Sequence, residues 1–423
     1  MEEKEKKPKI RFKGFTESWE QRKLSEIVTM HARIGWQNLR TSEFLKQGKY
    51  MLITGTDFEN GIVNYSSCHY VEKGRYEQDK NIQLKNESIL VTKDGTLGKV
   101  AYINNLRKPA TLNAGVFNIR IKDKKNDSSK YVFQYLKAPF LMNYVYKTAT
   151  GGTIKHLNQN ILVDFPINSP KYDEQSKVGV FFCELDNLIT LHQRKYDKLV
   201  NVKKSLLEKM FPKNDSNVPE IRFKGFTEAW EQRKLGDIVD LRGRIGFRGY
   251  KRTDLVAEGS GAVTFSPADI DDDGHLSLTN NTYISFEKYE ESPEIKVKEG
   301  DILFTKTASI GKIAYVSKLK EKSTINPQFA LLTPNKNIDG YFLFLSLRTE
   351  ECLKYVRDIS GGSSIPTMSQ EKLKEMKIIC PTLKEQHIMG EYYKKLDNLI
   401  TLHQRKLEKL KNIKKSLLEK MFV

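Results

Sequence analysis

Two loops rich in amide, hydroxyl and basic side chains could recognise another molecule. They cover residues 151–159 (GGTIKHLNQ) and 361–370 (GGSSIPTMSQ). Asn and Gln can hydrogen-bond an adenine edge through two atoms at once. The same loops could instead cap short helices, with Asn158 or Ser369 as the capping residue. Contact with a base and helix capping therefore both stay open. The candidate contacts are Lys155, His156, Asn158 and Gln159 in the first loop, and Ser363, Ser364, Thr367 and Ser369 in the second.

A second pair of segments places lysine beside glycine. Residues 92–99 (TKDGTLGK) and 305–312 (TKTASIGK) each follow a short apolar run. Backbone amides and ammonium groups in such a segment can approach a phosphate together. Neither copy has the spacing of a nucleotide-binding P-loop. A DNA contact and a plain structural hairpin are both open interpretations. The candidate residues are Thr92, Lys93, Lys99, Thr305, Lys306 and Lys312.

A third segment, residues 242–252 (RGRIGFRGYKR), interleaves basic, aromatic and glycine residues. Guanidinium groups fit guanine edges or phosphates, and glycines allow a close approach. A solvated basic loop is the alternative, but this mixture is typical of nucleic-acid surfaces. We therefore expect contact with DNA here. The candidates are Arg242, Arg244, Arg248, Lys251 and Arg252, and in the corresponding earlier segment Arg33, Trp36 and Arg40.

The composition supports a polyanionic partner. The chain has 423 residues with 71 Lys and Arg against 53 Asp and Glu, a net charge of 71 − 53 = +18. Such an excess favours binding to nucleic acid through phosphate neutralisation. The four cysteines form no CxxC pair, so we expect free thiols in a reducing cytoplasm and no metal site. Neither a signal peptide nor a membrane-spanning run of apolar residues is expected.

The chain is an internal repeat. Residues 10–24 and 221–235 agree at 14 of 15 positions, at an offset of 211. Residues 185–195 recur unchanged at 396–406, and residues 203–211 recur at 414–422. The interiors differ more, since residues 88–103 and 301–316 agree at 8 of 16 positions. A shared architecture with diverged interiors suggests one scaffold that carries two specificities, although drift after duplication is the simpler alternative.

The elements that must position these loops are mixed. Short apolar runs at 89–91 and 302–304 predict buried strands, with returning strands at 100–103 and 313–316. Residues 131–136 and 341–347 predict helices. We expect an α+β fold with two similar α/β domains. The expected boundaries are 1–170 for the first domain, 171–211 for a helix, 212–220 for a linker, 221–380 for the second domain and 381–423 for a second helix.

The ends of the two repeats predict long helices. Residues 174–211 contain almost no turn formers, which predicts a helix about 60 Å long. Their apolar residues alternate at spacings of three and four, as in a coiled coil. Because chain order makes the second helix return along the first, the pair is expected to be antiparallel, with the two repeats related by a pseudo-twofold axis. The expected seam or partner-docking residues are Leu185, Leu188, Leu199, Val202 and Leu206, and Leu396, Leu399, Leu410, Ile413 and Leu417.

The repeated IRFKGFTE-x-WEQRKL segment, the SGGSSIPTMSQ loop and the LDNLITLHQRKLEKLKNIKKSLLEKMF helix together resemble type I restriction-modification specificity subunits of the Firmicute kind. The resemblance covers the whole chain. It implies that each interior is a target-recognition domain for half of a bipartite, asymmetric DNA site. It further implies that the helices dock two modification subunits, which use S-adenosylmethionine to methylate adenine. Motor-nuclease subunits would add ATP- and Mg-dependent cleavage, so no catalytic residue or cofactor is expected in this chain.

Two other functions could also account for basic domains joined by long helices. A stand-alone DNA-binding repressor or architectural protein would use the same basic domains without partner enzymes. A coiled-coil scaffold with incidental charge would need neither. Two diverged basic domains argue against the scaffold. The near identity of the two helices predicts duplicate docking sites for one kind of partner, which argues against the repressor.

Overall fold

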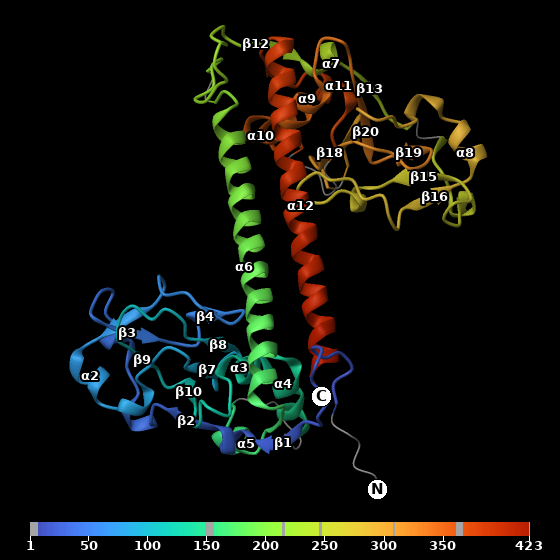
Figure 1. Cartoon of the computed structure of the whole chain (residues 1–423). Coiled ribbons are helices and arrows are strands. Elements are labelled where there is room, and N and C mark those ends of the chain that lie inside the picture. Colours follow the sequence, from blue (N-terminus) through green and yellow to red (C-terminus); the bar gives the residue numbers. More distant parts are fainter. Residues whose placement is uncertain are drawn as a thin grey trace. The chain divides into compact units, whose positions relative to one another are not determined.

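The computed structural model describes residues 7–148, 156–213, 216–244, 248–307, 309–360 and 367–422. The chain forms two compact units. Unit 1 consists of Met1–Gln193 with Arg405–Val423, and unit 2 consists of Arg194–Gln404. The blue-to-teal domain in Figure 1 belongs to unit 1 and the yellow-to-orange domain to unit 2.

Each unit is built on a four-stranded antiparallel sheet with the same strand order. Unit 1 has the order β2-β10-β7-β8 and unit 2 has β13-β20-β17-β18. These two sheets confirm the strands predicted from the apolar runs. Their strands are β2 (Val28–Ala32), β10 (Val116–Ile121), β7 (Ile89–Thr92) and β8 (Val100–Tyr102), and β13 (Val239–Arg242), β20 (Phe329–Pro334), β17 (Ile302–Thr305) and β18 (Ile313–Tyr315).

Both faces of this sheet are buried, which explains why its central strands are continuously apolar. Successive side chains of a strand point to opposite faces. In β7, Ile89 and Val91 join the core beneath the helices, whereas Leu90 joins a second core. Strand β17 divides its side chains between two cores in the same way. A run without polar residues is therefore required at this position in each unit.

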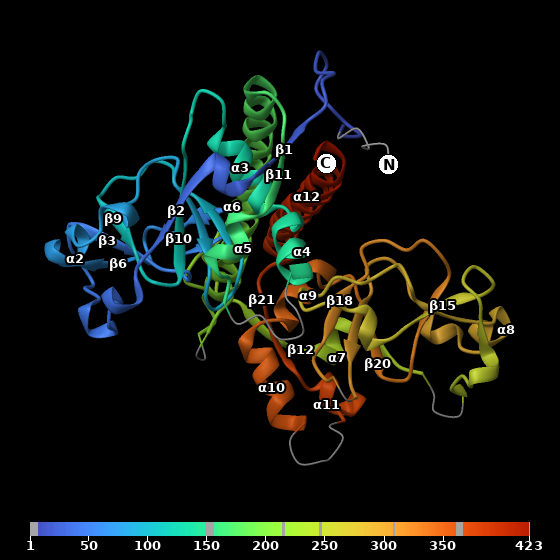
Figure 2. The same cartoon turned by 90° about the horizontal axis from the view of Figure 1, so that it is seen from below.

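The second core of each unit lies under a smaller sheet. In unit 1, β3 pairs antiparallel with β6 and parallel with β9, next to α2 (Lys73–Glu77), as Figure 2 shows. In unit 2, β15 pairs in the same two ways with β16 and β19. The strands are β6 (His69–Val71), β3 (Tyr50–Ile53) and β9 (Ala110–Leu112), and β14 (Leu255–Val256), β16 (Thr282–Ile284), β15 (Ala262–Phe265) and β19 (Ser323–Ile325).

Short helices and two-stranded ribbons complete the units. Helix α3 is buried from Tyr131 to Leu136 and α9 from Tyr341 to Leu347, which confirms both predicted helices. Besides α2, the short helices are α1 (Leu24–Ile27), α3 (Ser129–Lys137), α4 (Pro139–Thr148), α5 (Gln159–Val163), α7 (Leu235–Ile238), α8 (Phe286–Glu290), α9 (Gly340–Leu347), α10 (Glu350–Ser360) and α11 (Gln370–Lys374). The ribbons are β1 (Glu20–Lys23) with β11 (Pro166–Ser169), β4 (Phe58–Glu59) with β5 (Ile62–Val63), and β12 (Glu231–Lys234) with β21 (Lys377–Cys380).

Two long helices, α6 (Tyr172–Lys209) and α12 (Leu383–Met421), confirm the predicted helices. In unit 1, Asp186 Oδ1 lies 2.6 Å from Lys414 Nζ, and the rings of Phe182 and Phe422 are 5.5 Å apart. Residue numbers thus fall along α6 as they rise along α12. The helix segments within unit 1 are therefore antiparallel, as predicted.

Unit 2 holds the equivalent helix pair. Lys203 Nζ lies 2.6 Å from Asp397 Oδ1, which is the Asp186–Lys414 pair repeated at an offset of 211. Leu206 and Leu207 pack in the same core as Met389 and Tyr393. The two ion pairs set the same register in each unit, so the nearly identical helix sequences have a structural cause.

The repeated segments near residues 10 and 221 are fastened to these helices. Arg11 donates two hydrogen bonds to Glu174, at 2.7 and 2.8 Å. Arg222 makes the same two bonds to Glu385, both at 2.7 Å. Paired bonds of this geometry are strong and directional. The sequence identity at the ends of the repeats therefore preserves the contacts that hold each unit together.

The residues predicted for the helix seam or for partner docking differ in exposure. Leu185 and Leu396 are buried, and Leu199, Leu206, Leu410 and Leu417 are half-buried. Four others are exposed and so do not lie in a helix seam: Leu188, Val202, Leu399 and Ile413. Charged side chains join the two helices within each unit, through Asp186–Lys414 in unit 1 and Lys203–Asp397 in unit 2. Spacing of apolar residues alone could not reveal this, because charged side chains occupy interface positions.

The fold class is α+β with two similar domains and an internal repeat, as predicted. Among the described residues, no helix combines the length and hydrophobicity that crossing a membrane requires.

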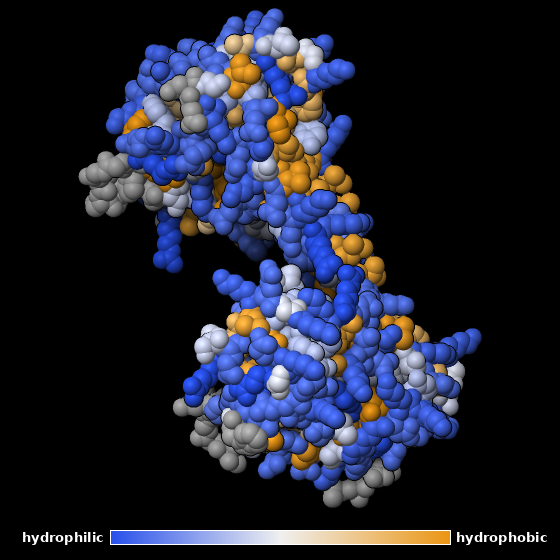
Figure 3. Space-filling view, turned by 90° about the vertical axis from the view of Figure 1, so that its left-hand side faces the viewer, coloured by the Kyte–Doolittle hydropathy of each residue, from blue (hydrophilic) through white to orange (hydrophobic). Residues whose placement is uncertain are grey.

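Figure 3 shows one face, where hydrophobic side chains interrupt a mainly hydrophilic surface.

Candidate nucleic-acid interface

In unit 1 the predicted residues from three separate segments line one cavity of about 470 Å³. Its walls come from the end of β2, from the loop after β7 and from the start of α5. We call this cavity, with its polar side chains, the first centre. The predicted residues that line it are Arg33, Lys93, His156, Asn158 and Gln159.

The hairpin after β7 is shaped by its own hydrogen bonds. The buried Thr92 hydroxyl donates to Thr96 O at 2.5 Å and accepts from Lys99 N at 2.9 Å. Gly98 has φ +70°, which favours glycine at this turn. In unit 2, Thr305 bonds Ser309 O and Lys312 N in the same way. The two threonine hydroxyls thus hold the turn and are not available to DNA, contrary to the expectation from sequence.

A backbone link joins this hairpin to the polar loop before α5. Leu157 N donates to Lys93 O at 2.8 Å. Next to it, His156 Nδ1 lies 2.6 Å from Asp94 Oδ1, and the imidazole must be the donor because an ionised carboxylate can only accept. The Lys93 ammonium lies over the Phe117 ring, 5.8 Å from its centroid. The first centre therefore presents a cation, a carboxylate and an imidazole together.

Arg33 in unit 1 and Arg244, its equivalent in unit 2, are structural residues. Arg33 is 2% exposed and donates from Nε to Leu112 O at 2.9 Å. Arg244 is 5% exposed and donates from Nε to Ile325 O at 3.0 Å. Burial lowers the pKa of both guanidinium groups. Sequence reasoning expected base or phosphate contacts here, but the two arginines are used to fasten β2 and β13 to the smaller sheets.

Unit 2 brings the corresponding segments together in a second centre. Met368 N donates to Lys306 O at 2.8 Å, and Thr307 and Thr367 form a β-bridge where unit 1 has Asp94 and His156. A Cβ atom placed on Gly243 would lie 2.5 Å from Gln370 Nε2 and 3.2 Å from Lys306 Nζ. The second centre is therefore formed by the same backbone links, with different side chains.

The capping alternative is resolved differently in the two loops. Ser369 Oγ accepts from Lys372 N at 3.2 Å and so caps α11. Asn158 occupies the N-cap position of α5, but its side chain makes no capping bond. Gln159 Nε2 donates to Met30 O at 3.4 Å. Of these three described residues, Asn158 is the one whose side chain makes no such bond and is left for a ligand.

The remaining predicted basic residues differ in exposure. Arg40, Lys251 and Arg252 are exposed. Arg242 bonds the Asp240 carboxylate and Glu294 O, and Arg248 donates to Glu291 O at 3.2 Å. Lys312 Nζ donates to Ile270 O at 3.3 Å, and Lys99 is half-buried. Lys155, Ser363 and Ser364 lie outside the described residues, as does the Trp36 side chain.

One residue of each centre was not predicted from the sequence: Asp94 in the first and Gln370 in the second. Asp94 and Gln370 were not selected, although both lie in the segments that were singled out. A carboxylate within a basic loop was the available signal for Asp94. Nothing in the sequence indicated that the Phe117 ring lies under Lys93, because Phe117 belongs to a strand distant along the chain. The alignment of β10 with β20 puts Ala330 at the place of Phe117.

The sequence matches a known protein family twice. The family is described as "Type I restriction modification DNA specificity domain", and it matches residues 16–201 and 227–412. The two matches cover most of the chain and coincide with its repeats.

Named relatives agree with this match. The chain is 25% identical to the type I restriction enzyme MjaVIII specificity subunit of Methanocaldococcus jannaschii, over 90% of this chain and 91% of the relative. It is 24% identical to the putative MjaX specificity subunit of that organism, over 95% and 92%. The crystal structure of the S subunit from M. genitalium shares the fold, with TM-score 0.60, 18% identity and 99% of each chain covered. The expected likeness to Firmicute subunits stays a prediction. The chain thus belongs to the family of type I restriction-modification specificity subunits, and it serves DNA sequence specificity without catalysis of its own.

Proposed function

We propose that each unit reads one half of a bipartite, asymmetric DNA site and thereby directs adenine methylation or restriction by partner subunits in the cytoplasm. The partners would supply the S-adenosylmethionine chemistry and the ATP- and Mg-dependent cleavage. This chain would contribute recognition and assembly.

One observation carries the proposal. The two centres share sheet order, backbone links and a buried arginine, yet differ in the side chains beside the cavity. Base edges are distinguished by donors and acceptors placed at fixed positions. An unchanged scaffold with exchanged polar groups is what two readers of different half-sites require. The net charge of +18 supports binding to the DNA backbone.

A domain exchange tests independent reading. Residues 236–378 would be replaced by the same segment of a relative with another target, and methylated adenines would be mapped by single-molecule sequencing. We expect one half-site to change and the other to stay. A change in both half-sites would contradict independent reading by the two units.

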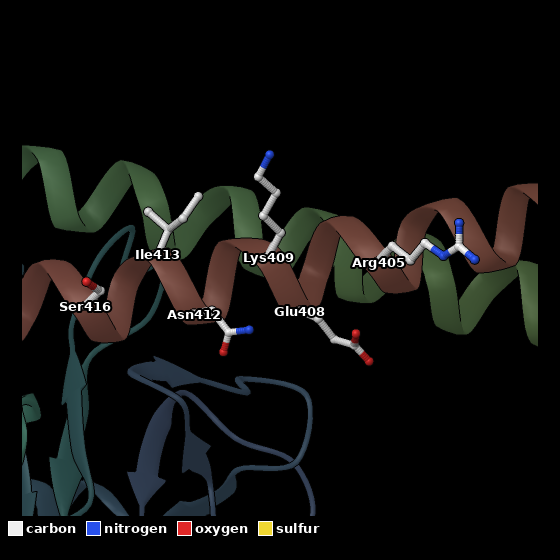
Figure 4. A pocket seen from close by; sticks show the side chains of 6 residues that line it. All are labelled: Arg405, Glu408, Lys409, Asn412, Ile413 and Ser416. Atoms are coloured by element: carbon white, nitrogen blue, oxygen red, sulfur yellow. The ribbon is translucent and has the colours of Figure 1, made fainter. Parts of the chain in front are cut away.

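We infer that two modification subunits of one kind dock on the repeated helices. Exposed apolar residues recur at an offset of 211, since Leu188 and Leu399 are both 47% exposed. Isolated exposed leucines are common, but the same exposures in two copies indicate a repeated surface. Within unit 1, Ile413 lies in a hollow of about 520 Å³ along α12, with Lys409 and Glu408 beside it (Figure 4).

This docking proposal predicts stoichiometry. Leu188→Glu and Leu399→Glu should each remove one of two bound modification subunits, and the double variant should remove both, as measured by native mass spectrometry. Arg252→Glu in the DNA-reading part is the matched control and should keep both partners. Retention of two partners by the double variant would reject this surface. A chain that acts alone as a repressor would bind none in any variant.

A further inference from the structure

The two centres differ most at one pair of positions. Where the loops meet, unit 1 has Asp94 and His156, and unit 2 has Thr307 and Thr367. One centre therefore contains an ionised acceptor that the other lacks. The inference below rests on the proposed function, because it concerns what each centre reads.

In the first centre, one oxygen of Asp94 is left for a ligand. Oδ1 accepts from His156, while Oδ2 makes no hydrogen bond with the described residues. The Asp94 side chain is 40% exposed and lines the cavity. A carboxylate repels phosphate, so it cannot serve as a backbone contact. It requires a donor, and the DNA major groove offers the exocyclic amino groups of cytosine and adenine.

The second centre contains the ammonium group of Lys306. Among the described residues, no carboxylate forms an ion pair with it. It is half-buried beside Gln370, over a floor left open by Gly243. The major-groove edge of guanine offers two acceptors, O6 and N7, which lysine binds. Phosphate is the other acceptor, but the exposed Lys251 and Arg252 can reach a backbone without a recessed site.

We propose that the two centres read bases of opposite hydrogen-bonding character. The first centre reads a base that presents an amino donor, cytosine or adenine, through Asp94. The second reads guanine, through Lys306 with Gln370 beside it. Each of these residues determines the base chosen at one position of its half-site.

The test uses the full chain reconstituted with its partner methyltransferase. A library of duplexes with randomised half-sites would be methylated and sequenced. Asp94→Asn keeps the size of the side chain and removes its charge. We expect the preference for cytosine or adenine at one position of one half-site to fall by about tenfold to a hundredfold, with the other half-site unchanged.

His156→Gln separates reading from positioning. This variant keeps the Asp94 carboxylate and removes the imidazole, so the amino-base preference should persist. If His156→Gln and Asp94→Asn shift the preference equally, the imidazole reads the base and the assignment of Asp94 is overturned. A preference for guanine at this position in the unmodified protein would overturn it as well.

Lys306→Met tests the second centre, with Lys251→Ala as its control. Lys306→Met should remove a guanine preference at one position of the other half-site. The control should weaken methylation of all sequences equally, as loss of a phosphate contact does. If Lys306→Met also weakens all sequences equally, Lys306 binds phosphate and the assignment is wrong. The unmodified protein reports separately on the proposed function, since a protein that selects no sequence in either half would refute that function first.

Discussion

Units 1 and 2 share one backbone architecture but differ in the side chains beside their centres. In both, residues of a four-stranded sheet and of the two long helices share one core, and one buried arginine is bonded to the smaller sheet. The first centre places Asp94 and His156 where the second has two threonines. The comparison teaches that the backbone links are kept, while the side chains that face the cavity are exchanged.

We call the ion pairs that join α6 to α12 helix locks: Asp186–Lys414 in unit 1 and Asp397–Lys203 in unit 2. The two locks differ in the number of lysines around the carboxylate. Asp186 bonds Lys414, Lys137 and Gln134, at 2.6, 2.9 and 2.8 Å. Asp397 bonds Lys203 and the hydroxyl of Tyr341. One lock therefore joins a carboxylate to two lysines, and the other joins it to one.

The largest effect should follow from breaking these locks. Asp186→Asn leaves two nearly buried lysines without a counter-charge, which should cost about 3–5 kcal/mol of unfolding free energy. Asp397→Asn leaves one lysine and a neutral hydroxyl, so its cost should be smaller, about 1–3 kcal/mol. Urea unfolding of both variants measures the difference. Equal costs would show that the second lysine of unit 1 is irrelevant.

The buried arginines should be nearly equivalent, in contrast to the locks. Arg33→Ala and Arg244→Ala each leave a strand carbonyl without its donor, which should cost about 2–3 kcal/mol. Thermal unfolding monitored by circular dichroism measures both. The exposed Arg40→Ala is the control and should change stability little. If these variants lose base preference but keep their stability, the two arginines contact DNA bases directly and the structural assignment is wrong.

The lock of unit 1 should depend on pH. Burial, then the neighbouring Lys137, lowers the pKa of Lys414 to about 8, from an ordinary value of 10.5. Between these two values the unfolded chain binds more protons than the folded chain at this residue. Stability should therefore rise between pH 8 and 10.5, by about 3 kcal/mol relative to Lys414→Met, and the cost of burial should be complete below pH 8. Parallel pH profiles of the two proteins would contradict the lowered pKa.

The smallest effect should come from the floor of the second centre. Gly243→Ala adds a Cβ atom that crowds Gln370 and Lys306, so methylation that depends on its half-site should fall about tenfold. The reciprocal change, Ala32→Gly in unit 1, only removes a methyl group and should have little effect. Methylation assays on cognate duplexes compare the two. If both changes have equal effects, the crowding argument fails.

Much of the fold could be predicted from the sequence, because its signals are local. Apolar runs predicted the central strands, and the absence of turn formers predicted the two long helices. The helix interface was predicted less well, since Leu188 and Leu399 are exposed while Lys414 is buried. The spacing of apolar residues cannot show that Asp–Lys pairs, and not leucines, occupy part of the contact between the two helices.

The site was predicted in outline. The sequence indicated the three segments that line the first cavity, but Arg33 and Thr92 proved to be structural, and Asp94 was missed. A side chain's role depends on whether a distant backbone group has already taken its hydrogen bonds. Leu112 O takes those of Arg33, and that strand is remote in sequence.

By itself the sequence determined the repeat, the helices, the central strands and the basic character, because identity, periodicity and charge are properties of the chain. Only the tertiary structure decided which polar groups are used internally and which are left for a ligand. Hydrogen-bond partners are chosen by distance in space, and Asp94 and His156 lie 62 positions apart along the chain.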